Sequence, residues 1–191
     1  MRLKPQGRPA ARPIGLAIAA ILAAAVEAWA QAPVNRDAAA VADFQKRVAA
    51  YIELRDKLAD SLPPLKQTDD PAEIAVRQAA LGGAIRAARA KARRGDIITS
   101  DVASIFRRVL KNDYRRRPAA ERRVMREEIP NFRPTVNQVY PSIWPLASFP
   151  ASLLDVMPPL PEPLEYRLLS ESLILRDVTA NIIVDFILDV Y

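Results

Sequence analysis

The chain of 191 residues contains no cysteine and no histidine, and this double absence removes several kinds of chemistry. Disulfide bonds, thiolate nucleophiles and lipid-modified cysteines are excluded, and so are catalytic pairs of the Ser-His or Cys-His kind. Zinc sites lose the ligands that they use most. We therefore expect no metal and no cofactor, and we assign no catalytic residue.

Glycine is also scarce, with 5 residues against 17 prolines, and the sequence has no glycine-rich phosphate loop. Eight of the prolines fall between Arg133 and Leu164, where no helical period holds. We expect residues 130–163 to form an ordered, proline-rich strap, with one or two turns of helix at 150–157. Its aromatic side chains would press into the helices, and these are Phe132, Tyr140, Trp144 and Phe149.

The first thirty residues have the three parts of a secretory signal peptide. Four basic residues precede an apolar run from Ile14 to Val26, and Ala28-Trp29-Ala30 follows with the A-x-A pattern of a cleavage site. As a helix this run would span about 20 Å, which is less than the roughly 30 Å of a membrane core. We expect cleavage after Ala30 and a periplasmic or secreted product. An uncleaved signal that keeps the chain at the membrane is the alternative.

After the signal, residues 31–191 are predicted to form a single α+β domain. Apolar residues that recur at intervals of three and four indicate helices. The predicted helices span 35–62, 71–94, 99–112 and 118–129. Asp70 and Thr99 suit the N-cap position of a helix, and Gly95 suits a left-handed residue after one. The pair Gly82-Gly83 indicates the close approach of a neighbouring helix, with a hinge as the alternative.

Residues 164–187 contain three short runs of large apolar residues separated by turn residues, which predicts a three-stranded antiparallel meander. Strict alternation places Ile182, Val184 and Phe186 on one face of the last strand. Arg176 and Asp185 are candidates for a cross-strand ion pair. Such a sheet needs a second layer, which the helices supply. Four aromatic residues are expected in the core, and these are Tyr51, Phe106, Tyr166 and Phe186.

The charge is unevenly distributed, because residues 84–123 carry thirteen basic and four acidic residues, whereas residues 124–191 carry four and nine. Arginine forms paired hydrogen bonds with phosphates and carboxylates. The candidate anion-binding residues are Arg93, Arg94, Arg107, Arg108, Arg115, Arg116, Arg117, Arg122 and Arg123. The alternative is a solvated face paired with the acidic C-terminal segment.

The expected partner is an anionic envelope component, such as a lipid headgroup or a lipopolysaccharide phosphate, or an acidic protein. Nucleic acid is not expected, because no aromatic residues alternate with the basic ones. We therefore interpret the chain as a non-enzymatic binding or structural module of the bacterial envelope. It would use the arginine-rich helices or an exposed sheet edge.

The alternative function is a periplasmic enzyme that uses carboxylates and arginine on an unknown substrate. Its candidate acid pairs are Glu127 with Glu128, Asp69 with Asp70, and Asp177 with Asp185. Adjacent acids on a helix point about 100° apart, and capping already explains Asp70. A converging pair of acids in a deep pocket would favour the enzyme, whereas dispersed acids on a shallow surface would favour the binding module.

Three stretches together resemble a family of uncharacterised exported bacterial proteins. They read FQKRVAAYIELRDKLADSLPPL (44–65), GAIRAARAKARRGDIIT (83–99) and LPEPLEYRLLSESLILRDVTANIIVDFI (160–187). The resemblance covers most of the chain after the signal, and it is most specific in RRGDI and in LEYR…LILRDV…NIIVDFI. It implies export but no activity, cofactor or partner. Similar sequences can carry His where this chain has Arg55 or Thr179, which we interpret here as a helix-surface residue and a turn residue.

Overall fold

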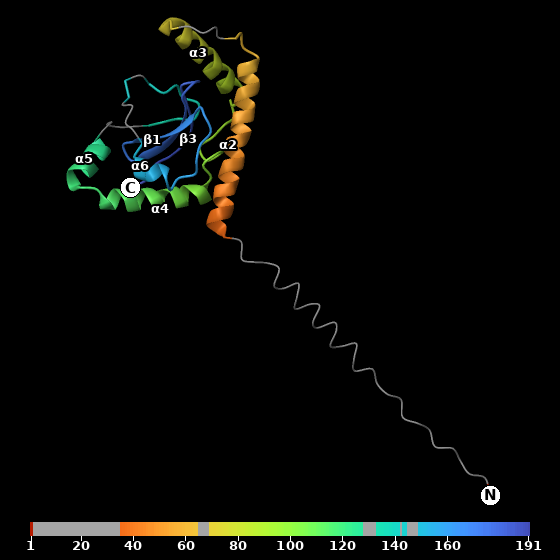
Figure 1. The fold of residues 1–191 in the computed structure, drawn as a ribbon, viewed down its shortest axis with the longest axis vertical. Helices are drawn as coiled ribbons and strands as arrows, with labels where there is room; N and C mark the ends of the chain where they lie inside the picture. Colours follow the sequence, from red (N-terminus) through yellow and green to blue (C-terminus); the bar gives the residue numbers. More distant parts are fainter. Residues whose placement is uncertain (2–34, 65–68, 128–132, 142, 145–148) are drawn as a thin grey trace. The chain divides into compact units, whose positions relative to one another are not determined.

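The computed structural model describes Met1 and residues 35–64, 69–127, 133–141, 143–144 and 149–191 (Figure 1). The predicted signal peptide, with Ala28 and Ala30, lies outside the described residues. Arg36–Tyr191 forms one compact unit. Among the described residues, no helix is both long and apolar enough to cross a membrane.

The described residues form five helices followed by three strands. The helices are α2 (Arg36–Asp60), α3 (Pro71–Ala88), α4 (Ser100–Arg116), α5 (Ala119–Glu127) and α6 (Ala151–Leu154). The strands are β1 (Leu164–Leu169), β2 (Ser172–Asp177) and β3 (Ile182–Ile187). This order confirms the predicted α+β class, with a small antiparallel sheet at the C-terminal end.

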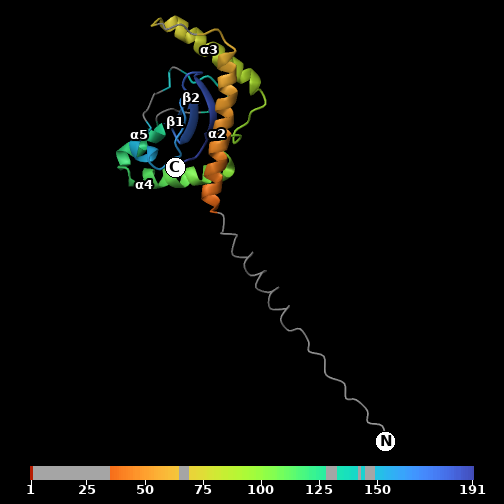
Figure 2. The same ribbon diagram turned by 45° about the vertical axis from the view of Figure 1, so that its right-hand side comes forward.

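Helices α2 and α4 carry the helical side of the core, and they pack against each other beside the sheet (Figure 2). Helix α2 buries Phe44, Val48 and Tyr51, which lie on one face at intervals of four and three. The rings of Phe44 and Phe106 meet edge to face with their centroids 5.3 Å apart. All four aromatic residues expected in the core are buried. Helix α4 runs four residues further than predicted.

Helix α3 differs most from its prediction. It ends at Ala88, six residues before the predicted end, and Ile74 is exposed although the spacing of the apolar residues predicts that it lies in the core. The cap at Asp70 is confirmed, because its carboxylate accepts a hydrogen bond from the N–H of Ala72. Thr99 is the N-cap of α4, but its hydroxyl makes no capping bond. Gly95 has a φ of 91°, so the left-handed residue lies at the predicted position, in a loop instead of directly after the helix.

The glycine pair in α3 allows a close approach, but the neighbour is a turn instead of the helix that we expected. A Cβ atom at Gly82 would lie 2.7 Å from the carbonyl oxygen of Ala180, in the turn between β2 and β3. A Cβ atom at Gly83 would meet nothing within 4 Å. The lack of space for a side chain therefore explains glycine at position 82 but not at position 83.

The strands pair in the order β1-β2-β3, all antiparallel. A β-bulge interrupts the second ladder: Arg176 pairs with Ile183 and Leu175 pairs with Asp185, so Val184 is the additional residue. Alternation reverses after the bulge, and Phe186 therefore lies on the opposite face from Ile182 and Val184. The prediction that these three share a face was wrong because a bulge cannot be read from alternation alone.

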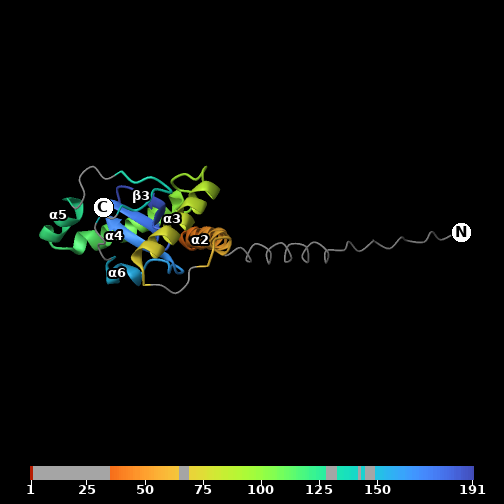
Figure 3. The same cartoon turned by 90° about the horizontal axis from the view of Figure 1, so that it is seen from above.

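Both faces of the sheet are covered. On the helix side, Leu173, Leu175 and Val184 belong to the main core. On the other side, Tyr140 packs against Ile174 of β2 and Ile183 of β3. Seen from above, residues 133–141 of the strap pass on one side of the sheet, and α6, a later part of the strap, lies on the other (Figure 3).

The strap was expected to press its aromatic side chains into the helices. This holds for Phe149, which packs against the helix-side core. It is wrong for Tyr140 and Trp144, which pack on the opposite face of the sheet. The reason is that the second face of the sheet is itself apolar and needs a cover. Phe132 lies outside the described residues.

Candidate functional site

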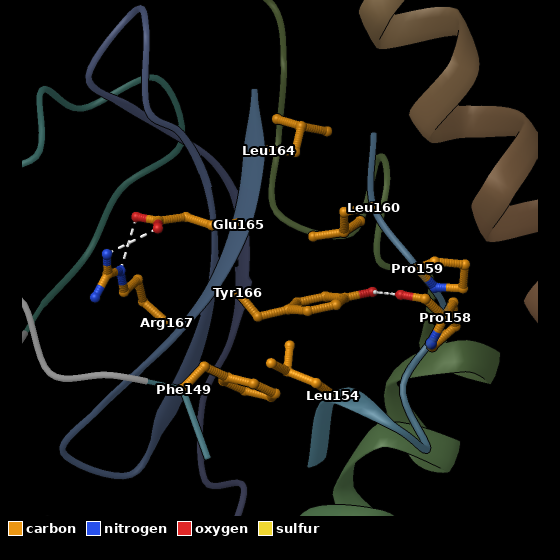
Figure 4. Close-up of a pocket in the computed structure, with 9 residues that line it drawn as sticks. All are labelled: Phe149, Leu154, Pro158, Pro159, Leu160, Leu164, Glu165, Tyr166 and Arg167. Atoms are coloured by element: carbon orange, nitrogen blue, oxygen red, sulfur yellow. Dashed lines mark hydrogen bonds and ion pairs between the residues drawn. The ribbon is translucent and has the colours of Figure 1, made fainter. Parts of the chain in front are cut away.

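A groove with a volume of about 560 Å³ runs along the outer edge of β1 (Figure 4). One wall is the strand itself, from Leu164 to Arg167. The other wall consists of Phe149, Leu154 and the segment from Pro158 to Leu160. Consecutive residues of a strand point to opposite faces of a sheet, so a hollow lined by four consecutive residues lies at the edge of the strand.

Alternate backbone groups of β1 face away from β2, on the side of the strand where the groove lies. The N–H of Val178 donates to the carbonyl of Pro163 at 3.0 Å, which sets the alternation of the β1–β2 ladder. The backbone groups of Leu164, Tyr166 and Leu168 therefore face away from β2. The N–H of Leu164 donates to Pro161 at 2.9 Å. Within the described part of the chain, the outward N–H and C=O groups of Tyr166 and Leu168 have no partner.

The far wall of the groove is anchored by Tyr166. Its hydroxyl donates to the carbonyl of Pro158 at 3.0 Å, and its ring lies 5.5 Å from that of Phe149 (Figure 4). Burial raises the pKa of Tyr166, so the hydroxyl stays protonated and remains a donor. Pro158 and Pro159 lack backbone N–H groups, so the wall is apolar and does not compete for the carbonyls of β1.

The opposite rim of the groove is charged. Arg167 donates to Glu165 through two nitrogen atoms, each at 2.7 Å, and Arg176 donates to the same carboxylate at 2.9 Å. Arg176 also lies over the ring of Tyr140 at 4.4 Å. The predicted pairing of Arg176 with Asp185 is therefore wrong, because the bulge turns Asp185 to the other face.

Asp185 holds the loop between α3 and α4. Its buried carboxylate accepts hydrogen bonds from the N–H groups of Gly95 (3.0 Å), Ile97 (2.9 Å) and Ile98 (2.8 Å). Burial raises the pKa of Asp185, and these N–H groups, with that of Phe186, counteract the rise. Every acceptor site faces the protein's own backbone, which gives Asp185 a structural role.

Asp177 forms a second buried site and shares no partner with Asp185. It accepts hydrogen bonds from the hydroxyl of Tyr51 (2.8 Å), the N–H of Ala180 (2.7 Å) and Nε of Arg55 (3.2 Å). Burial, and then the nearby carboxylate, raise the pKa of Tyr51. The two aspartates therefore do not converge as a catalytic pair would.

The interpretation of Arg55 as a helix-surface residue was wrong, because its side chain is only 13% exposed and pairs with a fully buried carboxylate. Thr179 lies in an exposed turn, as expected. Of the other acid pairs, Asp70 is a helix cap and Glu128 lies outside the described residues.

The nine candidate anion-binding arginines fall into two groups, those that contact other groups of the chain and those that do not. Five already contact groups of the chain: Arg107 binds the carbonyl of Leu188, Arg108 binds Asp37, Arg117 binds Asp113, and Arg94 and Arg122 lie over the rings of Phe186 and Tyr114. The side chains of the other four are exposed and make no hydrogen bond or ion pair with any described residue. These four are Arg93, Arg115, Arg116 and Arg123.

The nine arginines therefore do not form one patch. Arg115 and Arg116 lie in the last turn of α4, Arg123 lies on α5, the next helix, and Arg93 lies in the loop between α3 and α4. The alternative, in which these arginines pair with acidic residues of the C-terminal segment, is also wrong for the two that form ion pairs. Arg108 binds a carboxylate of α2, and Arg117 binds one of α4.

Sequence reasoning missed the roles of Glu165, Tyr166 and Arg167. A signal was present, because charged residues alternate with apolar ones in a strand that directly follows a proline-rich segment. It also missed Arg89, which donates to Asn137 (3.0 Å) and to the carbonyl of Val184 (3.1 Å). Burial lowers the pKa of Arg89.

Comparison with known proteins adds no assignment: no protein-family model, no curated protein and no solved structure matches the chain.

Proposed function

We propose that the chain is an exported, non-enzymatic binding module that takes up an extended segment of a partner along β1. The observation that carries this proposal is the groove at the edge of β1, where the backbone groups of Tyr166 and Leu168 face away from β2 and have no partner among the described residues. Adding a strand to an open sheet edge gives affinity through main-chain hydrogen bonds, and neighbouring hollows select side chains.

The chemistry of the two walls supports an extended peptide as the ligand. A strand in the groove would form main-chain hydrogen bonds with β1, and Phe149, Leu154 and the prolines would lie against one of its faces. Its apolar side chains would lie against this wall, and its polar ones would meet Glu165 and Arg167. The volume of about 560 Å³ is within the usual range of ligand sites, roughly 300–1,000 Å³.

The placement of the acids favours this function over an enzyme that uses carboxylates and arginine. Such an enzyme needs acids that converge on a pocket. The acid of the groove, Glu165, is bound by Arg167 and Arg176, whereas Asp177 and Asp185 are buried and bound by their own chain.

The proposal can be tested by selecting random twelve-residue peptides against the purified chain and measuring their affinities by calorimetry. Leu154 lines the groove and is 57% exposed, whereas Val156 is 59% exposed and does not line it. We expect Leu154→Arg to weaken binding about tenfold or more and Val156→Arg to leave it unchanged. Failure to select any peptide, or equal affinities for both variants, would overturn the proposal.

A second candidate function, binding to an anionic surface, is favoured by the exposed arginines in the last turn of α4 and on α5. Arg115, Arg116 and Arg123 are free to form bidentate bonds with phosphate. Reversing all three to Glu should abolish salt-sensitive binding to vesicles that contain phosphatidylglycerol, whereas reversing the exposed Lys46 and Arg86 should not. Vesicle binding that survives the triple reversal would exclude this role.

A further inference from the structure

Strand β1 carries a sequence that is complementary to itself. Leu164-Glu165-Tyr166-Arg167-Leu168 reads apolar, acidic, aromatic, basic, apolar. An antiparallel copy centred on Tyr166 places Glu165 opposite Arg167 of the second strand, and Arg167 opposite its Glu165. Leu164 then lies opposite Leu168, and the two Tyr166 residues face each other.

The open backbone groups of β1 fit this register. Residues 164, 166 and 168 face outward, and the register pairs 166 with 166 and 164 with 168. Each Tyr166 would exchange N–H and C=O bonds with its counterpart, and each Leu168 N–H would reach the carbonyl of Leu164. The N–H of Leu164, already bonded to Pro161, is not needed for either strand to bind the other.

The neighbouring registers are disfavoured by charge. Because outward groups must meet outward groups, the strand can slip only by two residues. A slip in one direction places Glu165 opposite Glu165, and a slip in the other places Arg167 opposite Arg167. Like charges directly opposite each other destabilise a strand pair, so the charges select the centred register.

We propose that the extended segment bound along β1 is β1 of a second copy of this chain, which joins two sheets into one sheet of six strands. This proposal rests on the proposed function, because it names the occupant of the same groove. The twofold arrangement uses the same surface on both copies and is therefore closed. The opposite edge of each sheet is already bridged by Val139 on Ile182, so the assembly would end at two copies.

Substitutions that reverse the charge of Glu165 or of Arg167 test this proposal. We expect the purified full-length chain to dimerise in sedimentation experiments as its concentration rises. Glu165→Arg and Arg167→Glu should each raise the dissociation constant about tenfold or more, because each creates two like-charged pairs. An equimolar mixture of the two variants should form a mixed dimer, in which every Arg faces a Glu. Dimers that survive either substitution, or a mixture that stays monomeric although both variants are folded, would overturn the proposal.

Glu165→Arg also places a second cation beside Arg176, so a measurement without substitutions is needed. Amide exchange of Tyr166 and Leu168 in the unmodified chain should slow as concentration rises, whereas the exposed Asp189 should show no change. If the chain stays monomeric while selected peptides bind at the groove, self-pairing fails and the proposed function stands. If no peptide binds either, both fail.

Discussion

The two edges of the sheet differ in whether their backbone groups are hydrogen-bonded. At the edge of β3, Asn137 donates to Ile183 (2.7 Å), Ile183 donates to Gln138 (2.8 Å) and Tyr140 donates to Asn181 (2.9 Å). At the edge of β1, the outward groups of Tyr166 and Leu168 have no such partner among the described residues. Open edges favour unwanted pairing, and proteins usually cover them. An edge whose described residues leave these groups unpaired beside a shaped groove therefore supports the proposed binding surface.

Most of the buried polar groups belong to the covered edge and its turn. Arg89 bonds the carbonyl of Val184, Asp185 holds the Gly95 loop, and Asp177 holds the turn before β3. At the open edge, the described residues show the partly exposed pair of Glu165 and Arg167, to which the buried Arg176 of β2 also donates. The comparison therefore separates stability from binding: changes at the covered edge should unfold the chain, and changes at the open edge should alter association.

The largest effect is expected from Asp185→Ala. It removes the acceptor of three loop N–H groups, so the free energy of unfolding should fall by roughly 3–5 kcal/mol in denaturant titrations. Asp155→Ala, at an exposed position with an ordinary φ of −71°, is the matched control and should change it by less than about 0.5 kcal/mol. Similar values for the two variants would show that the loop does not depend on Asp185.

The next effect separates the two glycines of α3. Gly82→Ala forces a Cβ atom against the Ala180 carbonyl and should destabilise the chain by about 1–3 kcal/mol. Gly83→Ala meets open space, so the better helix propensity of alanine should stabilise the chain by about 0.5–1 kcal/mol. Thermal unfolding of both variants gives the comparison. Effects of the same sign would contradict the close approach of α3 to the β2–β3 turn.

The sequence predicts well those elements that follow from local periodicity. The α+β class, the meander and the Asp70 cap follow from residue spacing and short-range hydrogen bonding. It fails where distant residues decide the result. Ile74 lies on a regular helix but is exposed, and the bulge at Val184 is defined by the pairing of β3 with β2.

The candidate site follows the same rule. Arginines were grouped because they are close in sequence, but Arg107 and Arg108 bind groups that are distant in sequence, the carbonyl of Leu188 and the carboxylate of Asp37. Arg117 instead binds Asp113, one turn earlier in the chain. The groove along β1 could not be predicted, because its second wall comes from Phe149 and from residues 158–160, whose positions depend on the strap.

A smaller effect is expected at the open edge. Arg167→Gln removes a partly exposed ion pair and should lower the free energy of unfolding by about 0–1 kcal/mol in a dilute, monomeric sample. Arg176→Gln, which removes a buried guanidinium from Glu165 and from the ring of Tyr140, should cost about 1–3 kcal/mol. A greater loss for Arg167→Gln than for Arg176→Gln would show that the open edge is needed for folding.

The smallest effect concerns the response of the covered edge to pH. Because burial raises the pKa of Asp185, the folded chain binds this proton more tightly than the unfolded chain does. The resulting stabilisation is complete below the ordinary pKa of aspartate and is lost as pH rises through the higher pKa of the folded state. The free energy of unfolding of the natural chain, minus that of Asp185→Asn, should therefore increase as pH falls from 7 towards 4. A difference that decreases over this range would mean that the N–H groups of the loop outweigh burial and that the carboxylate is stabilised in its charged form.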